Sequence, residues 1–281
     1  MEKEEIIDLA KTGDLGRSPK DYYDLGEEFQ RVGDFSNAFN AIYRSALLGY
    51  PKAQRKLGYF YEKGLGTSED KSKAYHYYSL ATAQGDIPSK ANLGMLLIKG
   101  EGCEKNEKLG FTLILEASED GNTKAMLALA RLYQKGIGVE QDLSRYYFWL
   151  EKCQEYGDES VDHLLGLCAF NGVGIEQSYE VAYNQFLRGA NQGDTNCYYY
   201  LGVMFSKGLF VEKDYAQAQH WYSLGANADD SRCMYNLGLF YENGVYLTKD
   251  LDKAMYWYKK AAASDFAKAN DKIKILTTEN K

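Results

Sequence analysis

The chain has 281 residues, of which 45% are hydrophobic, 26% are charged and only three are proline. This composition excludes disordered and collagen-like chains, and the scarcity of proline is typical of an almost wholly helical fold. A net charge of -7 and a pI near 5.2 argue against nucleic acid as the main partner, because binding to phosphates requires a basic surface.

The first residues, MEKEEIIDLA, are acidic and contain no long apolar run, so we expect no secretory signal and a cytoplasmic location. No stretch of about 18 consecutive apolar residues occurs, and we therefore expect no membrane span. The five cysteines form no Cys-x-x-Cys pair, which favours reduced thiols. We interpret residues 1–17 as an N-terminal capping helix.

Residues 18–50 form the first predicted helical hairpin. Pro19 directly after Ser18 is typical of a helix start. The hairpin is shorter than the units that follow it, and its pattern resembles a tetratricopeptide unit at Leu25, Gly26, Phe29, Gly33, Asp34, Ala38 and Tyr43.

From residue 51 to residue 266 the sequence repeats with a period of 36 residues. Six units carry a leucine at the same position: Leu57, Leu93, Leu129, Leu165, Leu201 and Leu237. A glycine follows each leucine seven residues later, at Gly64, Gly100, Gly136, Gly172, Gly208 and Gly244. A fixed period of this length indicates a solenoid, in which each unit buries its apolar face against its neighbours.

Each unit is predicted to contain two amphipathic helices, A and B, joined by a short loop with glycine. In residues 123–158 one apolar stripe runs through Ala125, Leu129, Leu132 and Tyr133, and a second through Leu143, Tyr146, Tyr147, Leu150 and Cys153. Residues that cap helix N-termini, each worth about 1 kcal/mol, precede both helices. They are Asp86, Asn122, Asp158, Asp194 and Asp230 before helix A, and Asp70, Asn106, Asp142, Ser178, Asp214 and Asp250 before helix B.

A glycine inside helix A is unexpected, because it costs about 1 kcal/mol relative to alanine. Five units nevertheless have one, at Gly58, Gly94, Gly166, Gly202 and Gly238. We predict that helix B approaches closely at these points, where a larger side chain would block it. In the last two units Phe210 and Tyr246 replace the second loop glycine, and we expect those loops to follow another backbone path.

The recurring pattern A-x-x-x-L-G-x-x-Y-x-x-G-x-G-x-x-x-D-x-x-K-A-x-x-W-Y-x-x-A-A resembles the Sel-1-like repeat (SLR), a relative of the tetratricopeptide repeat. The clearest match is residues 231–266, and one departure is Gln185, which stands in an aromatic position. The resemblance implies an all-α fold, a right-handed α/α superhelical solenoid whose A helices line the concave side. Residues 51–266 would be six repeats, followed by a C-terminal capping helix and tail at residues 267–281.

We find no constellation of catalytic or metal-binding residues in the sequence. The three histidines, His76, His163 and His220, are widely separated and lack an HExxH spacing. The KGLG, KGEG, KGIG and NGVG stretches lack the strand-to-helix setting of a phosphate loop. We therefore expect no enzymatic activity, no metal and no cofactor.

Two rows of helix A residues, four positions apart and so neighbours on one face, are not used by the packing stripe. The first row contains Tyr59, Met95, Arg131, Leu167, Val203 and Leu239, and the second Arg55, Ala91, Leu127, His163, Tyr199 and Tyr235. Tyrosine and arginine are enriched at interface hot spots, so we predict a partner-binding strip here. Its edge would contain Phe170, Lys63, Lys99, Lys135 and Lys207. Alternatively, the rows pack between successive A helices, and the lysines only complement the negative ends of those helices.

The leading interpretation is a non-catalytic, bacterial-type scaffold or adaptor that binds a protein or peptide in its concave groove. The alternative is a cytosolic immunity protein that neutralises a toxin domain, a role that an acidic surface would suit if the toxin were basic. An enzyme or an antibiotic-binding protein is a third hypothesis. We expect a monomer with no nucleic-acid or membrane partner, and the sequence does not identify the protein that it binds.

Overall fold

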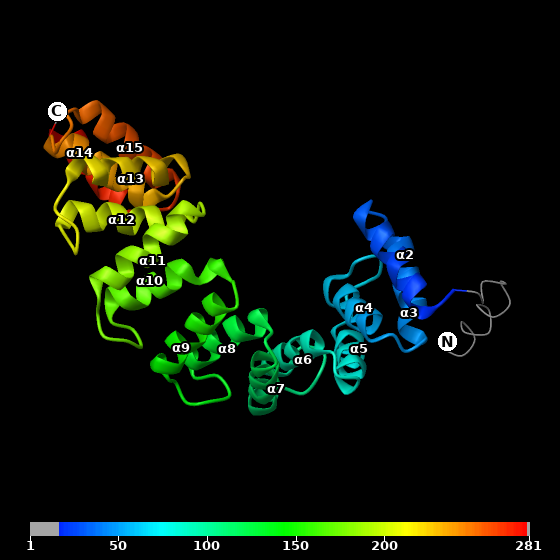
Figure 1. The fold of residues 1–281 in the computed structure, drawn as a ribbon. Coiled ribbons are helices and arrows are strands. Elements are labelled where there is room, and N and C mark those ends of the chain that lie inside the picture. Colours follow the sequence, from blue (N-terminus) through cyan, green and yellow to red (C-terminus); the bar gives the residue numbers. More distant parts are fainter. Residues whose placement is uncertain (1–16, 280–281) are drawn as a thin grey trace. The chain divides into compact units, whose positions relative to one another are not determined.

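A computed structural model describes residues 17–279, and all regular structure in this part of the chain is helical (Figure 1). The predicted capping helix at the N-terminus lies outside the described residues. Internal contacts divide the chain into two compact units, the first ending at Asp142 and the second beginning at Leu143. The division falls in a loop inside the third repeat.

In the described residues of unit 1 there are seven helices, α2 to α8. They are α2 (Pro19–Arg31), α3 (Phe35–Leu47), α4 (Pro51–Lys63), α5 (Lys71–Ala83), α6 (Ile87–Lys99), α7 (Glu107–Glu119) and α8 (Thr123–Lys135). The closest pairs are α2 with α3, α4 with α5 and α6 with α7, so consecutive helices form hairpins, and α6 also contacts α8.

Unit 2 begins with α9, the helix B of the third repeat. Its elements are α9 (Leu143–Glu155), the 3-10 turn η1 (Glu159–Val161), α10 (Asp162–Asn171), α11 (Tyr179–Asn191), α12 (Thr195–Lys207), α13 (Tyr215–Asn227), α14 (Ser231–Asn243), α15 (Leu251–Ala263) and α16 (Ala267–Glu279). The hairpins are α10–α11, α12–α13 and α14–α15, and α12 also contacts α14. In the six repeats, the A helices are therefore α4, α6, α8, α10, α12 and α14.

The predicted boundary residues act as caps. Side-chain oxygens accept hydrogen bonds from first-turn amides at Asp70, Asp86, Asn106, Asn122, Asp158, Ser178, Asp194, Asp214, Asp230 and Asp250. The glycines that end helix A take the left-handed conformation, with φ from 64° at Gly244 to 70° at Gly100. The cap prediction is confirmed at these ten positions, and at Asp142 it stays a prediction. The prediction for the six glycines is confirmed as well, because short-range hydrogen bonding and φ preference determine these boundaries.

The prediction of a different path for the last two A–B loops was wrong. Phe210 and Tyr246 have φ values of 66° and 61°, close to the 68° of Gly66 at the equivalent position. In the α12–α13 loop the amides of Leu209 and Asp214 donate to helix A carbonyls, both at 3.0 Å, and the other loops have the same two bonds. These bonds hold the loop in one conformation although an aromatic residue at positive φ is strained.

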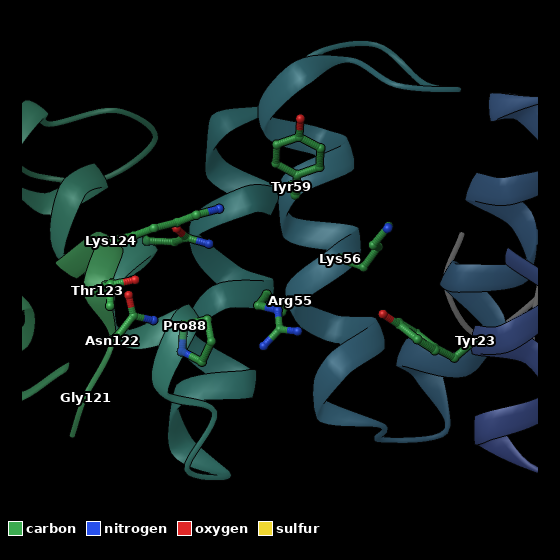
Figure 2. Close-up of a pocket in the computed structure, with 11 residues that line it drawn as sticks. Tyr23, Arg55, Lys56, Tyr59, Pro88, Gly121, Asn122, Thr123 and Lys124 are labelled. Atoms are coloured by element: carbon green, nitrogen blue, oxygen red, sulfur yellow. The ribbon is translucent and has the colours of Figure 1, made fainter. Parts of the chain in front are cut away.

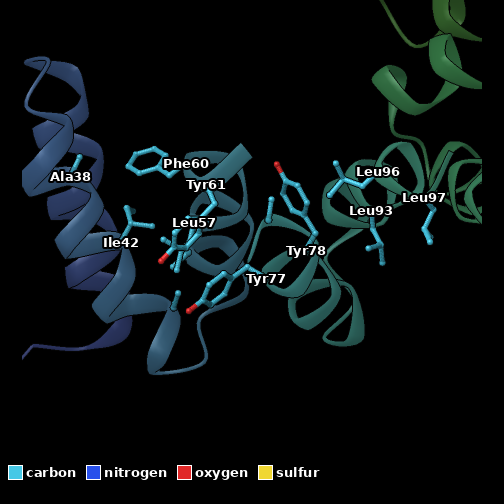
Figure 3. Packing of buried hydrophobic residues seen from close by; sticks show 13 residues of the cluster. Ala38, Ile42, Leu57, Phe60, Tyr61, Tyr77, Tyr78, Leu93, Leu96 and Leu97 are labelled. Carbon is cyan, nitrogen blue, oxygen red and sulfur yellow. The ribbon is translucent and has the colours of Figure 1, made fainter. Parts of the chain in front are cut away.

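The core runs through each unit from one hairpin to the next. In unit 1, Ile42 of α3, Leu57 and Phe60 of α4 and Tyr78 of α5 are fully buried in one cluster that extends to Leu93 of α6 (Figure 3). Each repeat therefore buries its apolar residues against its neighbours, as a repeat array requires.

The glycines inside helix A lie against buried side chains or backbone of helix B. A methyl group on Gly202 would stand 2.4 Å from Cε1 of Tyr222, and one on Gly58 would stand 2.8 Å from the ring of Tyr78. At Gly94 the obstacle is the backbone oxygen of Gly110, at 2.8 Å. The predicted close approach is confirmed, and it explains why these helices tolerate a poor helix former.

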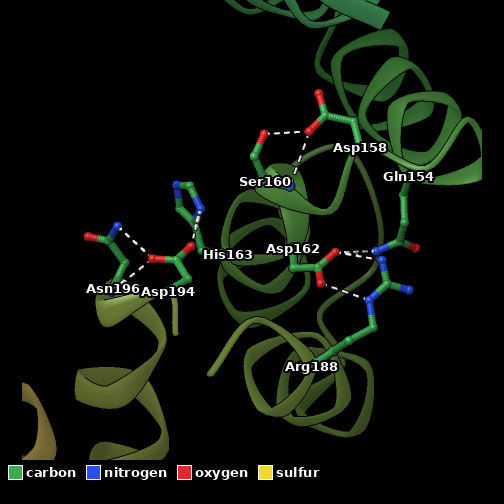
Figure 4. Close-up of polar contacts among 8 residues, drawn as sticks. All are labelled: Gln154, Asp158, Ser160, Asp162, His163, Arg188, Asp194 and Asn196. Atoms are coloured by element: carbon green, nitrogen blue, oxygen red, sulfur yellow. Dashed lines mark hydrogen bonds and ion pairs between the residues drawn. The ribbon is translucent and has the colours of Figure 1, made fainter. Parts of the chain in front are cut away.

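The fourth repeat departs from the others at its start. It begins with η1, and Asp162 at the start of α10 is fully buried. Arg188 donates from Nε and Nη2 to the two carboxylate oxygens at 2.7 and 2.6 Å, and Gln154 donates to the same carboxylate at 2.8 Å (Figure 4). Gln154 also donates to Gln185 at 2.8 Å. This polar network occupies the place of an aromatic side chain and compensates the buried carboxylate.

Candidate functional site

The predicted binding residues lie on two surfaces. We call the exposed side of α2, α4, α6 and α8 the unit 1 A-helix face, and the exposed side of α10, α12 and α14 the unit 2 A-helix face. The exposed predicted residues are Tyr59, Lys63, Lys99, Arg131, Lys135 and Lys207. Those of intermediate exposure are Arg55, Met95, Leu127, His163, Leu167, Phe170, Tyr199, Tyr235 and Leu239.

Part of the predicted strip on unit 2 belongs to the packing between repeats. The ring centroid of Phe170 lies 5.6 Å from that of Tyr200 in the next repeat. Within the sixth repeat, the ring centroid of Tyr235 lies 5.2 Å from that of Phe266, just before α16. Val203 is only 9% exposed and packs in the core with Tyr222, so it presents almost no surface and must be removed from the strip.

Two polar contacts on these faces connect one helix A to the cap of the next. Arg55 Nη1 donates to both carboxylate oxygens of Asp86, at 2.7 and 3.0 Å. In the equivalent position of the fourth repeat, Nδ1 of His163 lies 2.8 Å from the carboxylate of Asp194 (Figure 4). Because Asp86 and Asp194 also cap helices, these contacts fix the spacing of consecutive A helices.

The unit 1 A-helix face contains a hollow of about 560 Å³ formed by residues of α2, α4, α6 and the start of α8 (Figure 2). We call it the Ala91 hollow. Its lining includes Tyr23, Arg55, Lys56, Tyr59, Pro88, Ala91, Asn92 and Lys124. This volume lies within the range of about 300–1,000 Å³ that is typical of ligand sites.

The small side chain of Ala91 provides room for the hollow. The same position holds Arg55, Leu127, His163, Tyr199 and Tyr235 in the other repeats, all of which are larger. The sequence prediction included Arg55 and Tyr59 of this site but missed Lys56, Asn92 and Lys124. Lys124 lies three residues before Leu127 on the same helix, so the spacing of helical neighbours would have indicated it.

Three cations line the hollow, and two of them have acidic partners outside its lining. Arg55 pairs with Asp86, and Lys56 Nζ lies 2.6 Å from Glu27. Burial, together with the adjacent Glu27 carboxylate, raises the pKa of Tyr23 to about 12, so this phenol stays protonated and can donate. Lys124 is exposed and forms no ion pair within residues 17–279.

The cysteines are poor candidates for nucleophiles. All five are free, and burial raises the pKa of Cys153 and Cys197 to about 12 and that of Cys168 to about 11. A thiol reacts as the thiolate, which is scarce at neutral pH when the pKa is this high. In the described part of the chain, no three His, Cys, Asp or Glu side chains are placed to hold a metal ion. None of the helices in residues 17–279 combines the length and apolar character needed to span a bilayer.

A family profile matches six segments of the chain. The profile of the Sel1 repeat matches residues 51–86, 87–122, 123–152, 162–194, 195–230 and 231–266. The interval that it skips, residues 153–161, includes the 3-10 turn at the start of the fourth repeat.

Two solved structures resemble most of the chain. A protective antigen of uropathogenic Escherichia coli that displays an SLR fold is 25% identical with a TM-score of 0.83, over 97% of this chain and 58% of the antigen. A Sel1 repeat protein of Oxalobacter formigenes is 26% identical with a TM-score of 0.72, over 86% of this chain and 96% of that protein.

A curated relative matches a smaller part. An uncharacterised protein of Neisseria meningitidis serogroup B is 35% identical over 89 residues, which are 31% of this chain and 19% of that protein. The chain thus spans less than two thirds of the antigen and matches about a fifth of the neisserial protein.

Proposed function

This chain belongs to the Sel1 repeat family, and from that membership we propose that it is a non-catalytic scaffold or adaptor that binds a protein or peptide on its A-helix faces. The observation that carries the proposal is the Ala91 hollow, whose lining combines an exposed tyrosine with arginine and lysine side chains. Tyrosine and arginine contribute most of the energy at protein interfaces, and a concave site excludes water around them.

The rest of the molecule supports binding rather than chemistry. The buried, protonated thiols of Cys153, Cys168 and Cys197 lack the character of a catalytic nucleophile. The buried carboxylate of Asp162 accepts hydrogen bonds from Arg188 and Gln154, so its charge is already compensated within the protein. Five free cysteines, four of them buried, also favour a reducing, cytosolic setting.

A charge and packing variant of both faces tests the proposal. Arg131→Glu combined with Tyr199→Ala changes one predicted residue on each A-helix face. We expect this variant to lose the proteins that the wild type captures from cells of the source organism, as measured by quantitative mass spectrometry, while it keeps the helical circular dichroism signal.

The matched control is Lys108→Glu combined with Tyr256→Ala, which alters similar side chains exposed on the B helices α7 and α15. The control should retain every protein that the A-helix variant loses. Equal capture by wild type and the A-helix variant would place the binding surface elsewhere. Recovery of a toxin domain as the lost protein would instead identify the immunity function.

A further inference from the structure

We propose that the Ala91 hollow binds an acidic peptide segment, with a carboxylate near Lys124 and an apolar side chain over Ala91. This inference rests on the proposed function and specifies the chemistry of the partner at one part of the unit 1 A-helix face. The hollow has a shape that fits a side chain, a basic lining and unused hydrogen-bond donors.

The shape of the hollow provides a place for an apolar side chain. Ala91 of α6 lines the hollow together with Arg55 of α4 and Lys124 of α8. Pro88 lies one turn before Ala91 on α6, and the half-exposed ring of Tyr59 belongs to α4. The methyl group, the pyrrolidine ring and the phenol ring form apolar walls. A side chain of the partner that enters here is removed from water, which contributes about 25 cal/mol for each Å² of apolar surface.

The charge of the lining favours an anion. Arg55, Lys56 and Lys124 line the hollow, and none of its lining residues is acidic. Figure 2 shows Lys124 and Lys56 on opposite sides of the opening with Arg55 between them. Asp86 pairs with Arg55 and Glu27 pairs with Lys56, whereas Lys124 has no counter-ion within residues 17–279. The positive end of α8, which starts at Thr123, reinforces the preference.

The unused donors match a peptide rather than an isolated ion. Within the described residues the Asn92 amide makes no hydrogen bond, and Asn122 uses only its oxygen, which accepts from Ala125 N at 2.9 Å. Nε and Nη2 of Arg55 are likewise unused, since only Nη1 contacts Asp86. A side-chain amide offers both a donor and an acceptor, which pairs with a backbone peptide group.

A nucleic acid fits this surface less well than a peptide. Asp86 and Glu27 lie beside the cations, and the chain carries a net charge of -7, so a continuous phosphate backbone would be repelled on both sides of the hollow. A peptide with one or two carboxylates places its charge at Lys124 and its uncharged part on the remaining lining.

Selection from a random peptide library displayed on phage, with the purified full chain as bait, tests this inference. We expect the enriched peptides to contain Asp or Glu beside an apolar residue. For the best synthetic peptide, measured by isothermal titration calorimetry, Ala91→Tyr and Lys124→Glu should each weaken binding by roughly tenfold or more. Tyrosine occupies the position of Ala91 in the last two repeats, so helix A accommodates it there.

Matched variants come from the adjacent first repeat. Ala83→Tyr makes the same new side chain at an exposed alanine of the B helix α5 in the first repeat, and Lys52→Glu reverses the equivalent lysine of that repeat. Neither residue lines the hollow, so both variants should bind the peptide within about twofold of the wild type.

The outcomes separate this inference from the proposed function. Peptides without acidic residues, or acidic peptides that bind Ala91→Tyr as tightly as the wild type, would overturn the inference. If Tyr199→Ala or Arg131→Glu still abolishes binding of such peptides, the proposed function stands without this further inference. If no peptide responds to any A-helix variant, both fail. Tight binding of an oligo(dT) strand that is lost on Lys124→Glu would also overturn the inference.

Discussion

Gly202→Ala separates two physical effects that act in opposite directions. Alanine is the better helix former by about 1 kcal/mol, so intrinsic propensity alone predicts that the variant is more stable. In the structure the added methyl group would stand 2.4 Å from Cε1 of Tyr222, whereas carbon atoms in contact are about 3.5–4.0 Å apart. The ring would therefore have to retreat by roughly 1 Å.

Tyr222 has little freedom to move. It is 1% exposed and lies 5.7 Å from the Phe240 ring of the next repeat, with which it makes an edge-to-face contact. Overpacking of this kind costs about 1–3 kcal/mol. Because the buried Tyr222 ring has little room to retreat, we take the upper half of this range, about 2–3 kcal/mol, and after subtraction of about 1 kcal/mol of helix propensity we expect a net loss of about 1–2 kcal/mol for Gly202→Ala. Gly202→Leu should cost more, because three further carbon atoms must enter the same space.

Guanidinium unfolding followed by circular dichroism measures the loss, and hydrogen exchange of the α12 and α13 amides localises it. The third repeat has Ala130 in the glycine position together with Leu150 in the ring position, so Tyr222→Leu is the natural second substitution. The double variant should lose less than the sum of the single variants by about 1 kcal/mol. A Gly202→Ala variant as stable as the wild type, or more stable, would refute the close-packing explanation.

Three further predictions concern unit 2. Gly225→Ala places a methyl group 2.4 Å from Sγ of Cys233 and should lower the free energy of unfolding by about 1 kcal/mol. The additional change Cys233→Ala removes the sulfur and should restore this stability. Additive losses of the two changes in thermal melts would contradict this explanation. Tyr246→Gly should raise the free energy of unfolding by about 1 kcal/mol, because glycine adopts the φ of 61° without strain. Tyr246→Ala should leave the free energy of unfolding unchanged. Equal increases in the two variants would exclude backbone strain as the cause. Burial alone would raise the pKa of Glu242, but hydrogen bonds led by that from Lys272 outweigh it and lower the pKa. Stabilisation by this carboxylate is thus present above its unfolded pKa and lost as the pH falls through the folded value. At neutral pH the melting temperature of the wild type should be higher than that of Glu242→Gln. If this difference in melting temperature persists well below about pH 4, the assignment is contradicted.

The sequence predicted the features that depend on neighbouring residues along the chain. The caps at Asp70 and Asp250 and the helix end at Gly64 follow from hydrogen bonding within a few residues. The close approach at Gly202 could also be predicted, because glycine recurs in a helix position where it is unfavourable. Repetition makes such positions visible, since six units give six independent instances of the same environment.

Features that depend on packing between several helices were missed. Val203 lies on the predicted face but is buried, because residues of adjacent helices cover it. Phe210 keeps the left-handed backbone of a glycine, since bonds from both ends of its loop hold it there. The Ala91 hollow is lined by residues of the four helices α2, α4, α6 and α8. The small side chain of Ala91 leaves a hollow only because residues of the other three helices surround it.

Photo-cross-linking tests the binding role of the A-helix faces most directly. A benzoylphenylalanine residue replaces Tyr59, which is 40% exposed on α4, or Leu109, which is 45% exposed on the B helix α7 of the same unit. After irradiation in cells of the source organism, adducts are identified by mass spectrometry. We predict a polypeptide adduct at Tyr59 that is absent at Leu109. The same adduct at both positions, or an adduct at Leu109 alone, would contradict the assignment of the partner to the A-helix face.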